Sequence, residues 1–330
     1  MPISYPLDRP PHLTLRLGVL TMPLTDCKFV WRNGKIVPWQ QATVHVSCHG
    51  LHYGTGVFEG VRCYDTPSGP AVFRLGTHLD RWFASARTYG MAWPYSRHDL
   101  ARAVLEVIRA NQFRECYIRP IAFYGSHTLG INPKGCPTEL AILAWPWGTY
   151  MGADALVSGI DVCISAWRKF SSQAIPAGVK ACGQYLNSVL AAQDAAARGF
   201  GEALLLDDAG NLAEGSGENL FVVRRNRLFT NDQKSPVLLG VTRDSVIRIA
   251  IDLGMDVFLR NLELDDLMGA EEAFLTGTAA EITPIATVDM EPIGQGTRGP
   301  VTTKLQEAYR KAVLGRTSQY HDWLTYVTRH

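Results

Sequence analysis

The stretch Asn211-Leu-Ala-Glu-Gly-Ser-Gly-Glu-Asn-Leu-Phe221 sets two carboxylates, Glu214 and Glu218, among glycines directly before an apolar strand. A hairpin turn needs neither this charge nor this much backbone freedom. Glycine lets the backbone approach a ligand closely, and a carboxylate against a pyridine nitrogen keeps the ring protonated and able to accept electrons. The segment is therefore a candidate binding site for a pyridine-ring cofactor. Taken alone, these two carboxylates favour the other interpretation, a solvated hairpin turn.

Lys180 is the only charged residue from Phe170 to Gln193, and small or apolar residues flank it on both sides. A poorly hydrated amine has a lowered pKa, which a Schiff-base nucleophile requires. A lysine that extends from a loop to solvent would give the same local pattern. Lys180 is therefore a candidate nucleophile whose assignment depends on the other segments.

Two further segments have the residues to bind an anion. Gly240-Val241-Thr242 precedes a helix that we expect to begin near Arg243, so its first turn offers free N–H groups and a hydroxyl to a phosphate. Thr276-Gly-Thr-Ala-Ala280 follows an expected strand and offers the same groups from a turn. Threonine is also a common helix-cap and turn residue, which is the structural alternative at both places.

The composition excludes several classes of protein. The 32 basic and 31 acidic residues are interspersed, so no surface for a nucleic acid is expected. Apolar runs are far shorter than the roughly 20 residues of a membrane span, and seven cysteines lack a CxxC pair, so we expect a soluble, cytoplasmic protein. His45, His49 and His52 lie close together, but the segment before His49 is predicted to be a strand and no HExxH pattern is present, so no metal site is predicted.

The periodicity of apolar residues predicts an α+β protein with two domains. An Asn33-Gly34 turn joins two strands, and Thr77 is expected to cap the first of two amphipathic helices. Strands are predicted at 29–31, 35–37, 116–124, 140–144, 161–166, 203–206 and 220–223, and later helices at 185–198, 243–253 and 303–313. The predicted division is an irregular amino-terminal arm (1–25), a small α+β domain (26–147), an interdomain loop (148–157) and a large domain (158–330).

Six segments, in order along the chain, resemble the branched-chain aminotransferase family, the fold type IV group of pyridoxal-phosphate enzymes. The resemblance extends from about Phe29 to the carboxyl-terminal helix and implies two α/β domains with the active site between them. The segments are His52-Tyr-Gly-Thr-Gly-Val-Phe-Glu-Gly-Val-Arg62, Tyr117-Ile-Arg-Pro120, Lys180 with Tyr185-Leu186, Glu214-Gly-Ser-Gly-Glu-Asn-Leu-Phe221, Gly240-Val-Thr-Arg-Asp244 and Thr276-Gly-Thr-Ala-Ala-Glu-Ile282.

The resemblance implies a role for each residue of a cofactor site. Lys180 would form the Schiff base with pyridoxal 5′-phosphate and move a proton between the substrate Cα and the cofactor C4′. Tyr185 would bond the phenolic oxygen of the ring, and Glu214 the ring nitrogen. The phosphate would be bound by Arg81, Gly217, Val241, Thr242 and Thr278.

Substrate recognition has a physical basis besides the resemblance. Tyr117 and Arg119 are two residues apart on an expected strand, so both side chains project from one face into one pocket, which suits a dicarboxylate. The resemblance implies that Tyr117 and the Thr278-Ala279 turn bind the α-carboxylate, and that Arg119 binds the side-chain carboxylate of glutamate. It also implies a homodimer, with an apolar wall made of Phe58, Tyr150 and Tyr185 and of Tyr53 and Ile131 from a neighbouring subunit.

The implied reaction is transamination of leucine, isoleucine or valine with 2-oxoglutarate, which gives branched-chain 2-oxo acids and L-glutamate by ping-pong kinetics. An (R)-amine or D-amino-acid transaminase and an aminodeoxychorismate-type lyase share the scaffold and are the alternatives within it. Alternatives from a different class are a non-catalytic binding protein that keeps the fold and a Schiff-base aldolase that uses Lys180 without any cofactor. One methylene in an apolar wall shifts preference by only about 1 to 3 kcal/mol, so the preferred side chain is not predicted.

Overall fold

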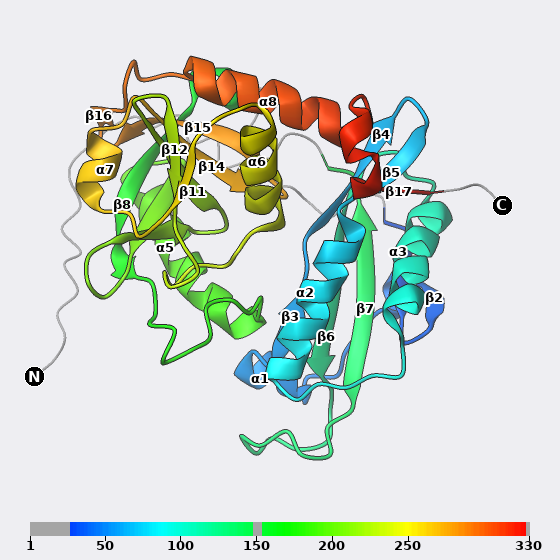
Figure 1. Cartoon of the computed structure of the whole chain (residues 1–330). Coiled ribbons are helices and arrows are strands. Elements are labelled where there is room, and N and C mark those ends of the chain that lie inside the picture. The colour runs from blue at the N-terminus through cyan, green and yellow to red at the C-terminus, as the bar shows by residue number, and fades with distance from the viewer. Residues whose placement is uncertain (1–26, 148–153, 328–330) are drawn as a thin grey trace, which may run out of the picture.

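The computed structural model describes residues 27–147 and 154–327. The predicted amino-terminal arm and Tyr150 lie outside these residues. The described chain forms two sheets with helices packed on them, as expected for an α+β protein (Figure 1).

The first sheet has eight strands in the order β17-β5-β4-β6-β7-β1-β2, with β3 beside β6. Its pairs are antiparallel, and the predicted hairpin is confirmed, because Asn33 and Gly34 both have positive φ between β1 and β2. The strands are β1 (Phe29–Arg32), β2 (Lys35–Pro38), β3 (Gly56–Phe58), β4 (Val61–Thr66), β5 (Gly69–Phe73), β6 (Cys116–Tyr124), β7 (Thr138–Trp145) and β17 (Leu324–Tyr326).

Two helices, α2 (Leu75–Thr88) and α3 (Arg97–Asn111), cover one face of this sheet and share a core with it. The prediction that Thr77 caps α2 is wrong. The helix begins at Leu75, whose side chain is buried in the core, and Arg74 takes the N-cap position with a φ of 52°. Shorter elements of this half are η1 (Trp39–Gln41) and α1 (His49–Tyr53).

The second sheet has nine strands in the order β10-β9-β8-β15-β14-β11-β12-β13, with β16 beside β15. β8 runs parallel to both β9 and β15, and β12 runs parallel to β13, so the sheet is mixed rather than doubly wound. The strands are β8 (Ile160–Arg168), β9 (Glu202–Leu206), β10 (Leu212–Gly215), β11 (Asn219–Arg224), β12 (Arg227–Thr230), β13 (Val257–Leu259), β14 (Glu272–Gly277), β15 (Glu281–Val288) and β16 (Glu291–Pro292).

The three helices predicted for the second half are confirmed as α5 (Tyr185–Arg198), α6 (Val241–Asp252) and α8 (Pro300–Val313). α8 begins before the predicted residue because Pro300, which has no N–H to satisfy, suits the first helical position. None of the helices in the described part of the chain is both long and apolar enough to cross a bilayer. The shorter helices are α4 (Ala155–Ser158), η2 (Cys182–Gln184), α7 (Leu264–Met268) and η3 (Ser318–Trp323).

The two halves share buried surface. Tyr64 and Phe73, on the face of the first sheet opposite α2 and α3, join Phe221, Leu305 and Tyr309 of the second half in one cluster. In Figure 1, α8 runs from the second half toward β4 and β5, and the chain then returns β17 to the first sheet. The last strand is therefore part of the first sheet, which the predicted domain of residues 158–330 did not anticipate. Residues 155–158, predicted as loop, form α4.

The three clustered histidines each form hydrogen bonds within the protein, His45 with the Ser47 hydroxyl and His52 with the Val46 carbonyl. The segment before His49 is a turn rather than the predicted strand, because the Cys48 N–H bonds the His45 carbonyl at 2.9 Å. His49 is buried and its ring bonds the Thr55 hydroxyl and the Gly130 carbonyl. Among the described residues no group of three or more ligating side chains is arranged to hold a metal.

Candidate active site

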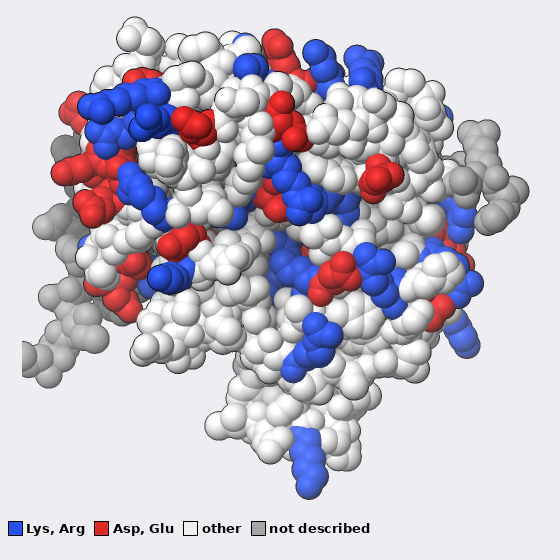
Figure 2. Space-filling model, viewed as in Figure 1, with Lys and Arg blue, Asp and Glu red and all other residues white. Residues whose placement is uncertain are grey.

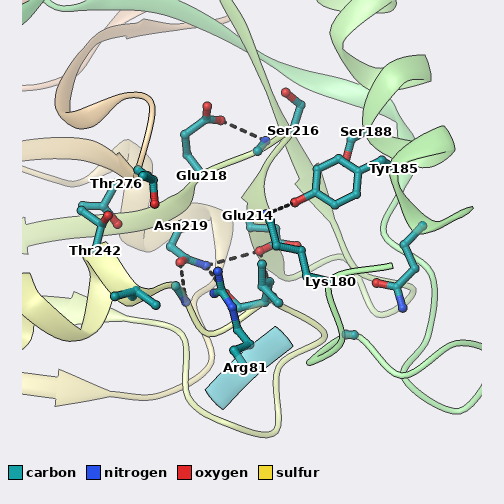
Figure 3. A pocket seen from close by; sticks show the side chains of 18 of the residues that line it. Arg81, Lys180, Tyr185, Ser188, Glu214, Ser216, Glu218, Asn219, Thr242 and Thr276 are labelled. Carbon is teal, nitrogen blue, oxygen red and sulfur yellow. Dashed lines mark hydrogen bonds between the residues drawn. The ribbon is translucent and has the colours of Figure 1, made fainter. Parts of the chain in front are cut away.

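One pocket at the junction of the two halves brings together every residue that was predicted to hold the cofactor (Figure 3). Its wall comes from α2, the start of α5, the β10–β11 turn, the start of α6 and the end of β14, which are remote from one another in sequence. The eight residues are Arg81, Lys180, Tyr185, Glu214, Gly217, Val241, Thr242 and Thr278.

Lys180 and Tyr185 point toward each other in this pocket (Figure 3), and the lysine Nζ donates to the tyrosine hydroxyl oxygen at 2.5 Å. Nζ also lies 4.9 Å from the centre of the Phe58 ring. Burial, followed by the nearby Arg81 guanidinium, lowers the pKa of Lys180 to about 8. A substantial fraction of this amine is therefore unprotonated and nucleophilic just above neutral pH.

Backbone contacts fix Lys180 to the first half of the protein. Its N–H donates to the Ser85 hydroxyl of α2 at 3.1 Å, and its carbonyl accepts the Phe58 N–H at 3.0 Å. Ala181 forms a bridge with Val57 on β3. The lysine is thus held between the two halves, and its position depends on how they pack.

Glu214 is buried on β10, and both of its carboxylate oxygens are bonded. Oε1 lies 2.6 Å from Lys169 Nζ, and Oε2 accepts the Leu238 N–H at 3.0 Å and the Asn219 side-chain amide at 3.3 Å. Asn219 in turn accepts the Gly240 N–H at 3.0 Å. These bonds hold the carboxylate in place and connect it to the first residues of α6.

Two more buried carboxyl groups support the turn that follows Glu214. Glu202 accepts the Ser216 N–H at 3.4 Å, and Glu218 accepts the Gly217 N–H at 3.0 Å. Burial, followed by the charge of Glu202, raises the pKa of Glu218 well above its usual range. Glu218 is therefore a buried residue that supports the turn, rather than the solvated turn residue that was the alternative in the sequence.

Arg81 is held by Glu59, a fully buried residue of the first half. Nε and Nη2 of Arg81 donate to the two Glu59 oxygens at 2.6 and 2.8 Å, and His78 Nδ1 lies 2.7 Å from Oε2. Burial opposes ionisation of Glu59, but Arg81 and His78 outweigh it and lower the pKa of Glu59 to about 2. Burial lowers the pKa of His78, so it acts as a neutral donor, and the ion pair is that of Glu59 with Arg81.

The pocket fits a phosphate-bearing ring. α6 begins after Gly240 without a side-chain cap, so its first N–H groups face the pocket beside Thr242. Gly217 lines the pocket, and no atom lies within 4 Å of where a Cβ would be. The Thr276 hydroxyl is buried in this wall and lacks a hydrogen-bond partner within the described residues. A guanidinium, threonine hydroxyls and a helix N-terminus are together a donor set for a phosphate.

The predicted substrate residues Tyr117 and Arg119 lie side by side beyond Phe58. The Arg119 guanidinium is 4.8 Å from the Phe58 ring and 5.5 Å from the Tyr117 ring, and its Nε is buried without a partner in the described part of the chain. Gly60 permits this arrangement, because a Cβ there would lie 1.9 Å from the Tyr117 hydroxyl oxygen. Both side chains can therefore reach a ligand that contacts Phe58.

The predicted substrate residues are only partly gathered in this pocket, and Phe58, Tyr117 and Arg119 are not among the residues that line it. Thr278 lines it but Ala279 does not. Tyr53 and Ile131 are exposed at the far end of the first half, where the Tyr53 hydroxyl donates to the Leu129 carbonyl at 2.6 Å. Tyr150 lies outside the described residues.

Three buried residues of the site were not assigned a role from the sequence: Glu59, Asn219 and Lys169. Glu59 and Asn219 lie within motifs that had been singled out, so their position in those motifs was an available signal. Lys169 follows Arg168 at the end of a strand, a pattern that is typical of solvated charge, and only the parallel pairing of β8 with β9 places it beside Glu214.

Comparison with known proteins agrees with this geometry. The family model for amino-transferase class IV matches residues 56–288. The branched-chain-amino-acid aminotransferase of Pseudomonas aeruginosa is 44% identical over 298 residues, which cover 90% of this chain and 97% of that protein. The enzyme of the same name from Escherichia coli K12 is 43% identical over 309 residues, covering 93% of this chain and 100% of its own.

Solved structures agree as well. A T.th. branched-chain amino acid aminotransferase with pyridoxamine 5′-phosphate superposes with a TM-score of 0.89 at 47% identity, covering 92% of this chain and 99% of that one. The same enzyme complexed with N-(5′-phosphopyridoxyl)-L-glutamate gives a TM-score of 0.88 at 46% identity, with the same coverage. The chain belongs to the class IV aminotransferase family and has the fold type IV architecture.

Proposed function

We propose that this aminotransferase binds pyridoxal 5′-phosphate in the pocket around Lys180 and transfers amino groups between branched-chain L-amino acids and 2-oxoglutarate. The observation that carries the proposal is the meeting, in one pocket, of Lys180 with Tyr185, Glu214 and Arg81. The relatives that are 43–44% identical carry the name of this activity. The free cysteines support a reducing compartment, and we infer a cytoplasmic location.

The cofactor, when bound, supplies an aldehyde for the lysine and a ring that accepts electrons from the substrate Cα. Lys180 would supply the amine that bonds the cofactor and would later hold the proton that leaves Cα. Tyr185, whose pKa burial raises, would remain protonated and bond the phenolic oxygen. Glu214 would face the ring nitrogen. Arg81, Thr242, Thr278 and the N–H groups of Gly217 and Val241, which line the pocket, would bind the phosphate.

Substrates would lie on the Phe58 side of Lys180. The Tyr117 hydroxyl and the Thr278-Ala279 turn would bind the α-carboxylate that leucine and glutamate have in common. Arg119, whose Nε has no hydrogen-bond partner among residues 27–147 and 154–327, would bind the second carboxylate of glutamate. An aliphatic side chain would instead contact Phe58 and Tyr185, whose rings lie 4.8 Å apart. One pocket can then serve both substrates in turn.

Half-reactions test the substrate class. The cofactor-loaded protein is mixed separately with L-leucine, L-glutamate, a D-amino acid and (R)-1-phenylethylamine, and the visible absorption of the cofactor is followed. Both L-amino acids are expected to bleach it. Failure of both to do so would exclude the branched-chain assignment, and bleaching by (R)-1-phenylethylamine alone would identify an (R)-amine transaminase.

Substitution of Arg119 should separate the two substrates. A hydrogen bond to a charged group contributes about 1.5 to 3 kcal/mol, so Arg119→Leu is expected to raise KM for L-glutamate and 2-oxoglutarate roughly 10- to 100-fold. KM for L-leucine should change by only a few-fold, because its side chain needs no cation. Arg119→Lys keeps the charge, so its KM for L-glutamate should lie between the values of the wild type and Arg119→Leu. An equal rise in KM for L-leucine and L-glutamate in Arg119→Leu would contradict the role assigned to Arg119.

We further infer that two copies of the chain form the active unit. Several large apolar side chains are exposed together at the tip of the first half: Val46, Leu51, Tyr53, Leu129 and Ile131. Two hydrogen bonds connect the loops that contain Val46 and Leu129 to α1. The His52 ring bonds the Val46 carbonyl, and the Tyr53 hydroxyl donates to the Leu129 carbonyl. Figure 2 shows few charged side chains on this lower projection, whereas both signs intermix elsewhere on the face in view. Exposed apolar surface of this kind suits a subunit interface.

Ile131→Asp tests the interface. Ile131 is 84% exposed, so the substitution leaves the core of one subunit intact, but a buried carboxylate at the interface would oppose association. The molecular mass from light scattering should fall toward that of one chain, and KM for L-leucine should rise. Ile251→Asp, at an exposed position on α6, is the matched control and should change neither value. An unchanged mass for Ile131→Asp would contradict the proposed interface.

A further inference from the structure

A second lysine, Lys169, reaches the pocket directly after β8. Its N–H donates to the Leu206 carbonyl at 2.8 Å, which extends the contact between β8 and β9. The side chain is only 9% exposed, with Nζ 2.6 Å from Glu214 Oε1 and 4.7 Å from the centre of the Phe170 ring. An ammonium group in such surroundings needs its carboxylate partner, because an unpaired buried charge is strongly unfavourable.

The contacts of Glu214 divide between its two oxygens. Oε1 has the ammonium of Lys169, while Oε2 has the Leu238 N–H and the Asn219 amide. The carboxylate is therefore fixed by three chain segments, those of Lys169, Asn219 and Leu238. The ammonium of Lys169 balances its charge. The carboxylate that would face the ring is therefore oriented by contacts within the protein.

We propose that Lys169 is a positioning residue, which balances the charge of Glu214 and orients its carboxylate toward the ring nitrogen; this inference rests on the proposed function. A protonated ring nitrogen that bonds Glu214 is a second cation on one carboxylate. Because Lys169 shares this carboxylate, the bond between Glu214 and the protonated ring nitrogen would be weaker than without it. In the protein without cofactor, Lys169 stabilises the fold by pairing with Glu214. Without Lys169, the ring proton would itself be the missing counter-charge.

Thermal unfolding with and without pyridoxamine 5′-phosphate tests this role. This form of the cofactor has no aldehyde and cannot bond covalently to Lys180, so the shift in Tm reports the non-covalent site. Without the cofactor, Lys169→Met is expected to melt roughly 5 °C or more below the wild type, since breaking a buried ion pair leaves one charge unpaired. The increase in Tm on adding the cofactor should be larger for Lys169→Met than for the wild type.

Two further variants provide the controls. Lys169→Arg keeps the charge and should restore most of the Tm without cofactor and a wild-type increase with it. Glu214→Gln leaves the ammonium unpaired, so Glu214→Gln combined with Lys169→Met should melt above Glu214→Gln alone. This comparison remains decisive if Lys169→Met does not fold by itself.

Three results would overturn the inference. The first is a cofactor-induced increase in Tm that is no larger in Lys169→Met than in the wild type, which would contradict the charge balance proposed for Lys169. The second is a double variant that melts below Glu214→Gln. The third is no increase in the Tm of the wild type on adding pyridoxamine 5′-phosphate, which would remove the proposed cofactor site itself. The first two leave that site intact, so the two failures are distinguishable.

Discussion

Replacement of Lys180 by alanine should reduce transamination by more than about 10³-fold. Its amine is the proposed nucleophile and also carries the proton, and proton transfer by a positioned group alone contributes roughly 10²- to 10⁴-fold. The visible absorption that the cofactor has when it is bound through Lys180 should also be lost. Turnover of L-leucine with 2-oxoglutarate and the absorption spectrum of the purified protein measure the two effects.

Unfolding should not contribute to this loss. The pKa of Lys180 is lowered from 10.5 to about 8 in the folded protein, so protonation of this amine opposes folding. The penalty is complete below pH 8 and vanishes above 10.5, and alanine removes it. Lys180→Ala should therefore keep or raise the Tm near neutral pH, while Lys304→Ala, at an exposed position on α8, should retain full activity. Full turnover by Lys180→Ala would disprove the central assignment.

Glu59→Ala is expected to give the largest loss of stability, about 3 to 5 kcal/mol in the free energy of unfolding. Glu59 is fully buried, and its removal leaves the guanidinium of Arg81 without its counter-ion inside the protein. Arg81 would also lose the two bonds that orient it toward the phosphate, so the affinity for the cofactor should fall. Denaturant unfolding and a cofactor titration measure these quantities.

The pH dependence of this stability has a defined sign. The folded-state pKa of Glu59 is lowered from 4.5 to about 2, so its ion pair stabilises the wild type fully above pH 4.5 and loses this contribution as the pH falls toward 2. The difference between wild type and Glu59→Ala should therefore shrink in acid. Asp65→Ala removes the exposed ion pair with Arg114 and should change stability little at any pH. A similar small effect of Glu59→Ala would show that the buried pair is unimportant.

Local patterns predicted the elements well and their ends less well. The Asn33-Gly34 hairpin and helix α5 follow from the residues themselves, because turn chemistry and apolar spacing act over a few residues. The start of α2 was misplaced because burial of Leu75 outweighed the capping preference of Thr77. The turn before His49 was mistaken for a strand, since a few apolar and β-branched residues do not reveal where the backbone bonds are made.

The sequence by itself determined the residue types of the site: a lysine in apolar surroundings, a glycine-rich acidic turn and two segments with free N–H groups. These features are local, so they can be read along the chain, and all eight residues predicted for the cofactor line one pocket. Only the tertiary structure decided which charges are paired. Glu59 meets Arg81 across 22 residues, and Lys169 meets Glu214 through the parallel pairing of β8 and β9. Burial and long-range pairing set the cost of each charge, and neither has a local signature in the sequence.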